Sequence, residues 1–386
     1  MRHLAAHGLV GPGNLRPTGP EVADILREHA YGLKLNSEQL RAVRAIVHCR
    51  TAWLGGHLEV CKLCGFETHA YNSCRNRHCP KCQILRQELW AEAQEQRLLP
   101  VPYFHVIFTI AAELHPLFRR ARRVCLKLLF ESVSETLLEI AQTHLKAQIG
   151  FTAILHTWTQ KLRYHPHIHC IVPAGGLSPD GSRFRSCKAN FFLPVRKLRS
   201  VFKAKLKDKL QQALTAGEIR FPVAEGLDLI RRAAQKTWVV EVKPPLAGPQ
   251  QVVRYLSRYV HRIAISNSRI LAYDGRTVTF RYKDRADQNK TKSRTVEAPI
   301  FARLFLQHVL PKRFVRIRHY GLLATRAGKK LKRCRVLLGV PQPKPIEKDQ
   351  SWVHAYQRIF GRDPTLCPKC KVGHLVPRLV LPPLRL

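Results

Sequence analysis

Apolar side chains recur at helical spacing in the first part of the chain. Residues 21–30 and 37–48 follow this pattern, and residues 84–98 follow it again after a cysteine-rich segment. Such spacing predicts amphipathic helices, and Pro100 and Pro102 mark the end of the last one. We therefore predict a helical N-terminal domain that also holds a group of cysteines.

From residue 103 onwards, short β-branched and aromatic runs alternate with helical stretches. The predicted order is strand 103–110, helix 114–146, strands 151–158 and 167–173, helix 195–214, strand 238–242 and helix 250–262. A hairpin, with strands 269–273 and 277–282 around Asp274 and Gly275, follows. This order favours a sheet covered by helices on one face, so the expected fold class is α+β.

The net charge narrows the range of functions. The chain has 66 Lys and Arg against 26 Asp and Glu, which gives a net charge of +40. This excess is spread over the whole chain and implies a polyanionic partner, of which nucleic acid is the usual one. No apolar run reaches the roughly 18 residues of a membrane helix, and the first residues do not form a signal peptide. We therefore expect a cytoplasmic protein with no membrane contact.

The cysteines predict structural zinc. In a reducing compartment, clustered cysteines favour metal over disulfides. Cys61-x-x-Cys64 and Cys79-x-x-Cys82 are separated by 14 residues, and two such turns can complete one tetrahedral Zn²⁺ site. Other residues lie near enough to compete as ligands or to build a second site: Cys49, His57, Cys74 and His78.

Two further features belong to the cysteine motifs. The segment 72–82, which ends with the second motif, also carries Arg75 and Arg77, and a basic zinc module suits DNA recognition. Near the C-terminus, Cys367-x-x-Cys370 is half of a metal site. It either takes ligands from elsewhere in the chain or binds nothing.

His167 and His169 form a candidate site for a divalent metal. They lie two residues apart on a predicted strand, so both side chains project from one face. Ile168, Cys170 and Val172 make the other face apolar and suited to packing on helices. Imidazole suits Mn²⁺ and Zn²⁺ better than Mg²⁺. The alternative is that both histidines are satisfied core residues.

Tyr255 and Tyr259 are candidate nucleophiles. Their spacing places both rings on one face of the predicted helix, one turn apart. Core packing is the alternative reading, but the surrounding residues are too polar for a buried stripe; they are Arg254, Arg258, His261 and Arg262. Nearby cations and a metal-polarised phosphate would favour attack by a phenol.

These motifs, in this order, resemble the IS91-type transposases of the HUH endonuclease superfamily. The resemblance rests on CRTAWLGGH (49–57), YNSCRNRHCPKCQ (71–83), HPHIHCIVPAGGLS (165–178), YLSRYVHRIAISNSRI (255–270) and LPKRFVRIRHYGLL (310–323). It implies a ferredoxin/RRM-like HUH nuclease domain (100–330), preceded by an N-terminal zinc-binding domain (1–99). A basic C-terminal tail (331–386) follows.

The resemblance also implies a mechanism. Tyr255 and Tyr259 would be the paired catalytic tyrosines that cut single-stranded DNA and form 5′-phosphotyrosine links, as in rolling-circle-like transposition. His167 and His169 would hold catalytic Mg²⁺ or Mn²⁺. The third ligand has weak candidates in Gln251 and His261. The expected partner is single-stranded DNA at the ends of the element and at the target. The resemblance leaves open whether the protein forms a homo-oligomer.

Two alternatives accompany this hypothesis. A rolling-circle replication initiator or a relaxase would use the same chemistry. A non-catalytic zinc DNA-binding protein would not, and the intact histidine and tyrosine pairs argue against it.

Overall fold

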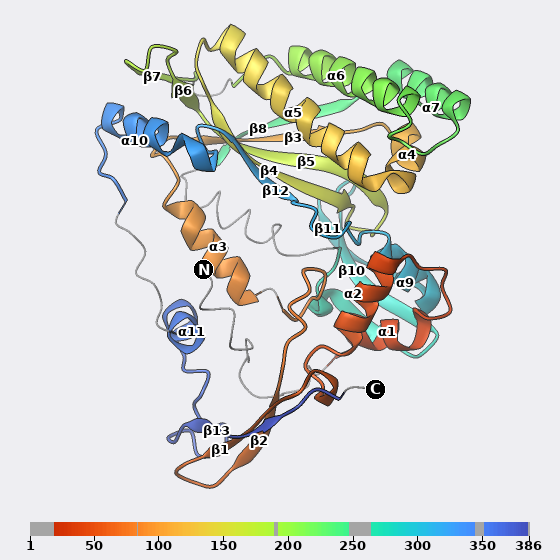
Figure 1. Cartoon of the computed structure of the whole chain (residues 1–386), viewed down its shortest axis with the longest axis vertical. Coiled ribbons are helices and arrows are strands. Elements are labelled where there is room, and N and C mark those ends of the chain that lie inside the picture. The colour runs from red at the N-terminus through yellow and green to blue at the C-terminus, as the bar shows by residue number, and fades with distance from the viewer. Residues whose placement is uncertain (1–18, 83, 189–191, 247–263, 344–350, 385–386) are drawn as a thin grey trace.

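The computed structural model describes residues 19–82, 84–188, 192–246, 264–343 and 351–384 (Figure 1). The predicted tyrosine helix, with Tyr255, Tyr259, Arg254, Arg258 and Arg262, lies outside these residues. Within them, none of the helices combines the length and the apolar character that crossing a membrane requires.

A five-stranded antiparallel sheet forms the centre of the molecule. Its strands run in the order β12-β4-β5-β3-β8. Their bounds are β3 (Tyr103–Thr109), β4 (Gly150–Trp158), β5 (Tyr164–Pro173), β8 (Val239–Leu246) and β12 (Ile317–Gly321). The strands predicted from residues 103, 151, 167 and 238 are therefore confirmed, whereas the edge strand β12 was not predicted.

Helices cover one face of this sheet (Figure 1). They are α4 (His115–Arg120), α5 (Arg122–His144), α6 (Val195–Thr215) and α7 (Val223–Gln235), of which α7 was not predicted. Ile168, Cys170 and Val172 point to this face and share a core with Leu129 of α5 and Phe202 of α6. The apolar side of β5 packs on helices, as predicted, so His167 and His169 face the other way.

The opposite face of the sheet is also partly covered. Ile154 and Ile171 share a buried cluster with Cys334 of α10 (Gly328–Leu337), against which Trp90 of α3 (Ile84–Glu95) packs. Beside this cluster, a small hairpin is formed by β6 (Gly175–Leu177) and β7 (Phe184–Ser186).

The two N-terminal helices pack on a second, three-stranded sheet. The helices are α1 (Val22–His29) and α2 (Ser37–Val47), and both were predicted. The sheet consists of β9 (Ile270–Tyr273), β10 (Thr277–Asp284) and β11 (Lys290–Glu297), followed by α9 (Ala298–Leu306). The predicted β9–β10 hairpin is confirmed, with Gly275 at a φ of +84° in its turn.

A third sheet joins the two ends of the chain. β1 (Gly56–Cys61) lies between β2 (Glu67–Tyr71) and β13 (Leu375–Leu381), and both pairings are antiparallel. Helix α11 (Trp352–Phe360) precedes β13 in the chain and lies above this sheet, at the left of Figure 1. Part of the predicted C-terminal tail (331–386) is thus a strand of the sheet formed by β1 and β2. The division of the chain at residues 99 and 330 stays a prediction.

Candidate functional site

Three histidines meet on the face of the central sheet that is turned away from α5 and α6. His156 of β4 lies directly opposite His167 of β5, and His169 follows two residues later on the same face. One ring nitrogen of each histidine lies within 4.8 Å of the others. The structure therefore brings the predicted pair together with His156, a third possible metal ligand.

His156 was missed because its own strand gives no signal. It lies in an apolar and aromatic run, where a single histidine is unremarkable. Only the register of β4 against β5 places it beside His167. Proximity of this kind depends on strand pairing, and the sequence of one strand does not contain it.

Further hydrogen bonds orient the rings of the histidine cluster. His167 donates from Nδ1 to the carbonyl of His165 at 2.6 Å, which leaves the lone pair on Nε2. His105 of β3 bonds through Nε2 to Nδ1 of His169 at 2.7 Å. Bonds to the second ring nitrogen fix the tautomer and orientation of metal-binding histidines.

Burial keeps these imidazoles neutral. It lowers the pKa of His167 to about 3 and that of His169 well below its ordinary value. Burial, with help from Lys243 and Arg285, also lowers the pKa of His105 to about 4. A neutral imidazole is the form that coordinates a metal, so the rings need not lose a proton at neutral pH.

A first cysteine cluster lies at the end of α2. It contains Cys49, Cys74, Cys79 and Cys82, whose sulfur atoms all lie within 4.8 Å of one another. Cys82 Sγ is 3.2 Å from Cys49 Sγ and 3.6 Å from Cys74 Sγ. Four thiolates at such distances match a closed tetrahedral zinc site.

The structure corrects the predicted grouping of the cysteines. Cys61 and Cys64 lie at the turn between β1 and β2, where they meet Cys367 and Cys370 instead of Cys79 and Cys82. The two Cys-x-x-Cys turns are neighbours in sequence, but the β1–β2 hairpin carries the first away from α2. The half-site at Cys367 therefore takes its partners from the other end of the chain.

His78 is also placed differently from its predicted role as a zinc ligand. Its Nδ1 bonds Asn76 Oδ1 at 3.0 Å, and its Nε2 accepts the backbone N–H of Leu310 at 3.1 Å. Both ring nitrogens are thus engaged by the protein, and Cys49 completes the first cluster. Cys74, the other open candidate, does belong to that cluster.

The two arginines of this segment differ in their surroundings. Arg75 is exposed, as a DNA contact requires. Arg77 is half-buried and donates to the carbonyls of Phe314 and Pro311, so it holds the 311–314 segment against the cysteine cluster. The structure thus favours a structural role for Arg77 over the predicted contact with DNA.

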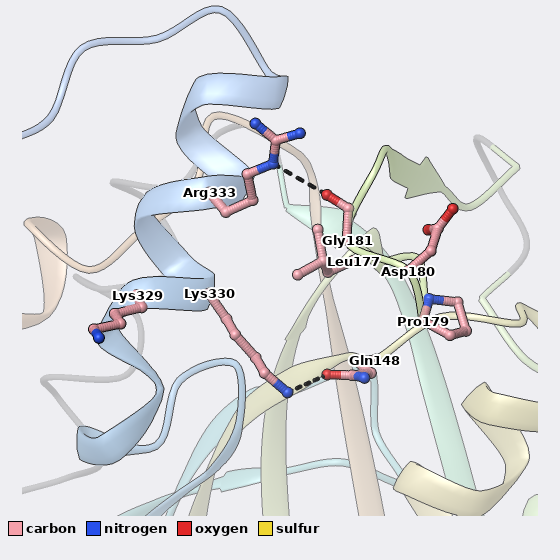
Figure 2. A pocket seen from close by; sticks show the side chains of 8 residues that line it. All are labelled: Gln148, Leu177, Pro179, Asp180, Gly181, Lys329, Lys330 and Arg333. Carbon is pink, nitrogen blue, oxygen red and sulfur yellow. Dashed lines mark hydrogen bonds between the residues drawn. The ribbon is translucent and has the colours of Figure 1, made fainter.

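A basic pocket lies between α10 and the β6–β7 hairpin (Figure 2). Lys330 Nζ donates to Gln148 Oε1 at 2.7 Å, and Arg333 Nε donates to the carbonyl of Gly181 at 3.0 Å. Lys329 also lines it, and none of the clustered histidines or cysteines does. The lining thus has three cationic side chains and the carboxylate of Asp180, and it is separate from the candidate metal sites.

Two family models of transposases match the chain, and one of them describes a zinc-binding domain. Residues 150–330 match a family model described as "Putative transposase", and residues 21–110 match one described as "Transposase zinc-binding domain". No solved structure gives a significant match.

Two curated relatives cover most of the chain. "Putative transposase y4qJ" of Sinorhizobium fredii (strain NBRC 101917 / NGR234) is 42% identical over 377 residues, which are 93% of this chain and 95% of the relative. "Transposase for insertion sequence element IS801" of Pseudomonas savastanoi pv. phaseolicola is 29% identical over 347 residues, with coverage of 87% and 82%. The chain therefore belongs to the IS91-type family of transposases and has that family's zinc-binding domain.

Proposed function

We propose that this transposase cuts and rejoins single-stranded DNA through 5′-phosphotyrosine intermediates at Tyr255 and Tyr259. The observation that carries the proposal is the cluster of His156, His167 and His169 on the sheet. A transposase that uses tyrosine nucleophiles needs a group that polarises the scissile phosphate, and this cluster can hold one.

The donor set of the cluster fits a divalent metal. Three neutral nitrogen ligands leave coordination positions for phosphate oxygens and water. Nitrogen ligands favour Mn²⁺ over Mg²⁺, so we propose Mn²⁺ or Mg²⁺ with the former bound more tightly. When bound, the metal would stabilise charge that develops on the phosphate. We propose His156 as the third ligand in place of Gln251 or His261.

The proposed reaction conserves the phosphate ester. The phenol oxygen of one tyrosine bonds to phosphorus, and the bond from phosphorus to the 3′-oxygen breaks. The proton that the phenol loses is balanced by the proton that the 3′-oxygen gains. Attack by a 3′-hydroxyl on the phosphotyrosine then rejoins a strand, and two tyrosines let the protein hold two strand ends in turn.

The arginines around the tyrosines have a proposed electrostatic role. A free phenol has a pKa of about 10 and is mostly protonated at neutral pH. Arg254, Arg258 and Arg262 lie within one turn of a tyrosine in the sequence. We propose that they stabilise the phenolate and the DNA phosphates.

The strand order supports assignment to the ferredoxin/RRM-like HUH class. Strands β3, β4, β5 and β8 with helices α5 and α6 follow the order β-α-β-β-α-β along the chain. In the sheet they lie in the order β4-β5-β3-β8, with the helices on one face. The candidate metal site would then lie on the face of the sheet opposite α5 and α6, which we propose as the side that receives DNA.

The first cysteine cluster has a proposed structural role. We propose that Cys49, Cys74, Cys79 and Cys82 bind Zn²⁺ and hold the segment with Arg75 next to the end of α2. A zinc site of four thiolates is closed to substrate and stabilises a fold that has little core.

The test is cleavage of labelled single-stranded DNA from the ends of the element. Wild-type protein should form a covalent adduct with the 5′ end of the cut strand. Tyr255→Phe with Tyr259→Phe should abolish the adduct, because only the two hydroxyl groups are removed. The control is Tyr31→Phe at an exposed tyrosine, which should leave the yield of the covalent adduct unchanged.

Each single tyrosine variant separates cutting from transfer. One of them should still cut an oligonucleotide, because the second phenol lies one helical turn away. Neither should complete a strand transfer that needs two strand ends held together. An adduct that persists in the double variant, mapped by mass spectrometry to another residue, would refute the mechanism and favour a different nucleophile.

A further inference from the structure

Four cysteines from opposite ends of the chain converge between two turns. Cys61 and Cys64 lie in the turn from β1 to β2, and Cys367 and Cys370 lie in the turn before β13. Cys61 Sγ is 3.7 Å from Cys370 Sγ, and Cys64 Sγ is 3.7 Å from Cys367 Sγ. All four sulfur atoms lie within 4.8 Å of one another.

These distances match zinc ligation and not disulfides. Four sulfurs at about 2.3 Å from a tetrahedral Zn²⁺ lie about 3.8 Å from one another. A disulfide would bring two sulfurs to about 2.05 Å and leave the other pair apart. The four cysteines are all unpaired thiols.

The two turns have the same backbone geometry. The N–H of Gly65 donates to the carbonyl of Cys61 at 3.0 Å, and the N–H of Lys371 donates to the carbonyl of Cys367 at 3.0 Å. In each turn the residue after the second cysteine has a positive φ, +68° at Gly65 and +59° at Lys371. The repeated geometry aims two pairs of sulfurs at one point.

Close packing at Gly373 brings the turns together. A Cβ atom at this position would lie 2.7 Å from Cys61 Sγ and 2.7 Å from Leu63 Cβ. Cys367 donates its N–H to the carbonyl of Gly373 at 2.8 Å. A larger residue would therefore push the C-terminal turn away from the first.

The sheet that carries these turns has almost no apolar core of its own. Among the described residues, its buried cluster consists of Cys61, Cys367 and Leu375, with Cys64, Phe66 and Cys370 packed at its edge. Four of these six residues are the cysteines themselves. A sheet with so little buried apolar surface needs another source of stability, and a bound metal is the usual one.

We propose that Cys61, Cys64, Cys367 and Cys370 bind a second structural Zn²⁺, which fastens β13 to the β1–β2 hairpin. The site is composite, because neither end of the chain supplies more than two ligands. The bound zinc would link the C-terminal strand β13 to the N-terminal β1–β2 hairpin. It is separate from the cluster at Cys49 and from the histidine cluster.

The first experiment counts zinc by native mass spectrometry of the full chain. Cys367→Ser with Cys370→Ser should bind one zinc ion fewer than wild type. The control is Cys187→Ser, a half-buried cysteine outside the clusters, which should leave the count unchanged. An unchanged count in the double variant would overturn the proposal.

Hydrogen exchange tests the fastening of the strand. In the double variant the amides of residues 375–381 should exchange at least about tenfold faster, while those of β3 and β5 stay protected. Equal protection of residues 375–381 in the two proteins would show that zinc does not hold β13, and would overturn that part of the proposal.

A measurement on wild-type protein does not depend on how the variant folds. With zinc bound, Cys64 and Cys370, which are only partly buried, should resist alkylation, because zinc ligation occupies their thiolates. Removal of zinc with a chelator should make the four cysteines of this site reactive together; they are Cys61, Cys64, Cys367 and Cys370. Alkylation of Cys64 and Cys370 at the same rate before and after removal of zinc would contradict the site.

Discussion

At the scale of single residues, the histidine cluster separates groups that would touch a metal from one that only orients a ligand. His156 and His167 face each other across two strands, and His105 hydrogen-bonds to Nδ1 of His169. The two kinds of residue should differ in how much they contribute to metal affinity.

We expect His156→Ala to weaken Mn²⁺ binding more than His105→Ala does. Loss of an orienting partner costs about 10- to 100-fold in metal affinity, and loss of a direct ligand should cost more. Calorimetric titration with Mn²⁺ measures both effects, with His144→Ala on the surface of α5 as the control. Equal affinity of His156→Ala and wild type would remove His156 from the site.

At the scale of elements, the edge strand β12 depends on one glycine. Gly321 has a φ of +55°, and a Cβ atom there would lie 2.0 Å from the carbonyl oxygen of Ile149. The close approach holds the end of β12 against the start of β4, where Gly321 pairs with Gly150. The pairing of these strands therefore leaves no room for a side chain at this position.

Gly321→Ala should lower the free energy of unfolding by about 1–3 kcal/mol, because it adds both backbone strain and a steric clash. Urea denaturation followed by circular dichroism measures the change. Gly328→Ala is the matched control, since a Cβ atom at that position meets nothing within 4 Å. A Gly321→Ala protein as stable as the control would show that β12 can shift without cost.

At the scale of the whole molecule, the net charge of +40 should dominate affinity for DNA. The positive groups are not equivalent. Lys205 and Lys209 of α6 form ion pairs with Glu135 and Glu139 of α5, so part of their charge is already neutralised. The basic pocket at α10 contains Lys329, Lys330 and Arg333, with Asp180 as the one acidic residue in its lining.

Replacement of Lys329, Lys330 and Arg333 by Gln should reduce the salt dependence of single-stranded DNA binding. Each lost phosphate contact lowers the slope of log affinity against log salt by about 0.7 for single strands, so the full effect is about 2. Fluorescence anisotropy at several salt concentrations measures this slope. Lys205→Gln with Lys209→Gln should change this slope less. A larger change in that variant than in the pocket variant would contradict a role for the pocket in DNA binding.

Local patterns in the sequence predicted four strands of the central sheet, several helices and the candidate site residues. Helical spacing predicted α1, α2 and α6, and β-branched runs predicted β3, β4 and β5, because amphipathic periodicity is a property of each segment alone. The His-x-His spacing placed His167 and His169 on one face, since alternation along a strand needs no partner. The motifs were also sufficient to indicate the family.

Tertiary structure decided which of these groups meet. The register of β4 and β5 brought His156 to the histidine pair, and the pairing of β1 with β13 brought Cys367 and Cys370 to Cys61 and Cys64. The sequence favoured joining Cys61 and Cys64 to Cys79 and Cys82, because proximity along the chain was the only guide to proximity in space. Contacts between distant segments depend on how strands pair and how cores close, and no local pattern records them.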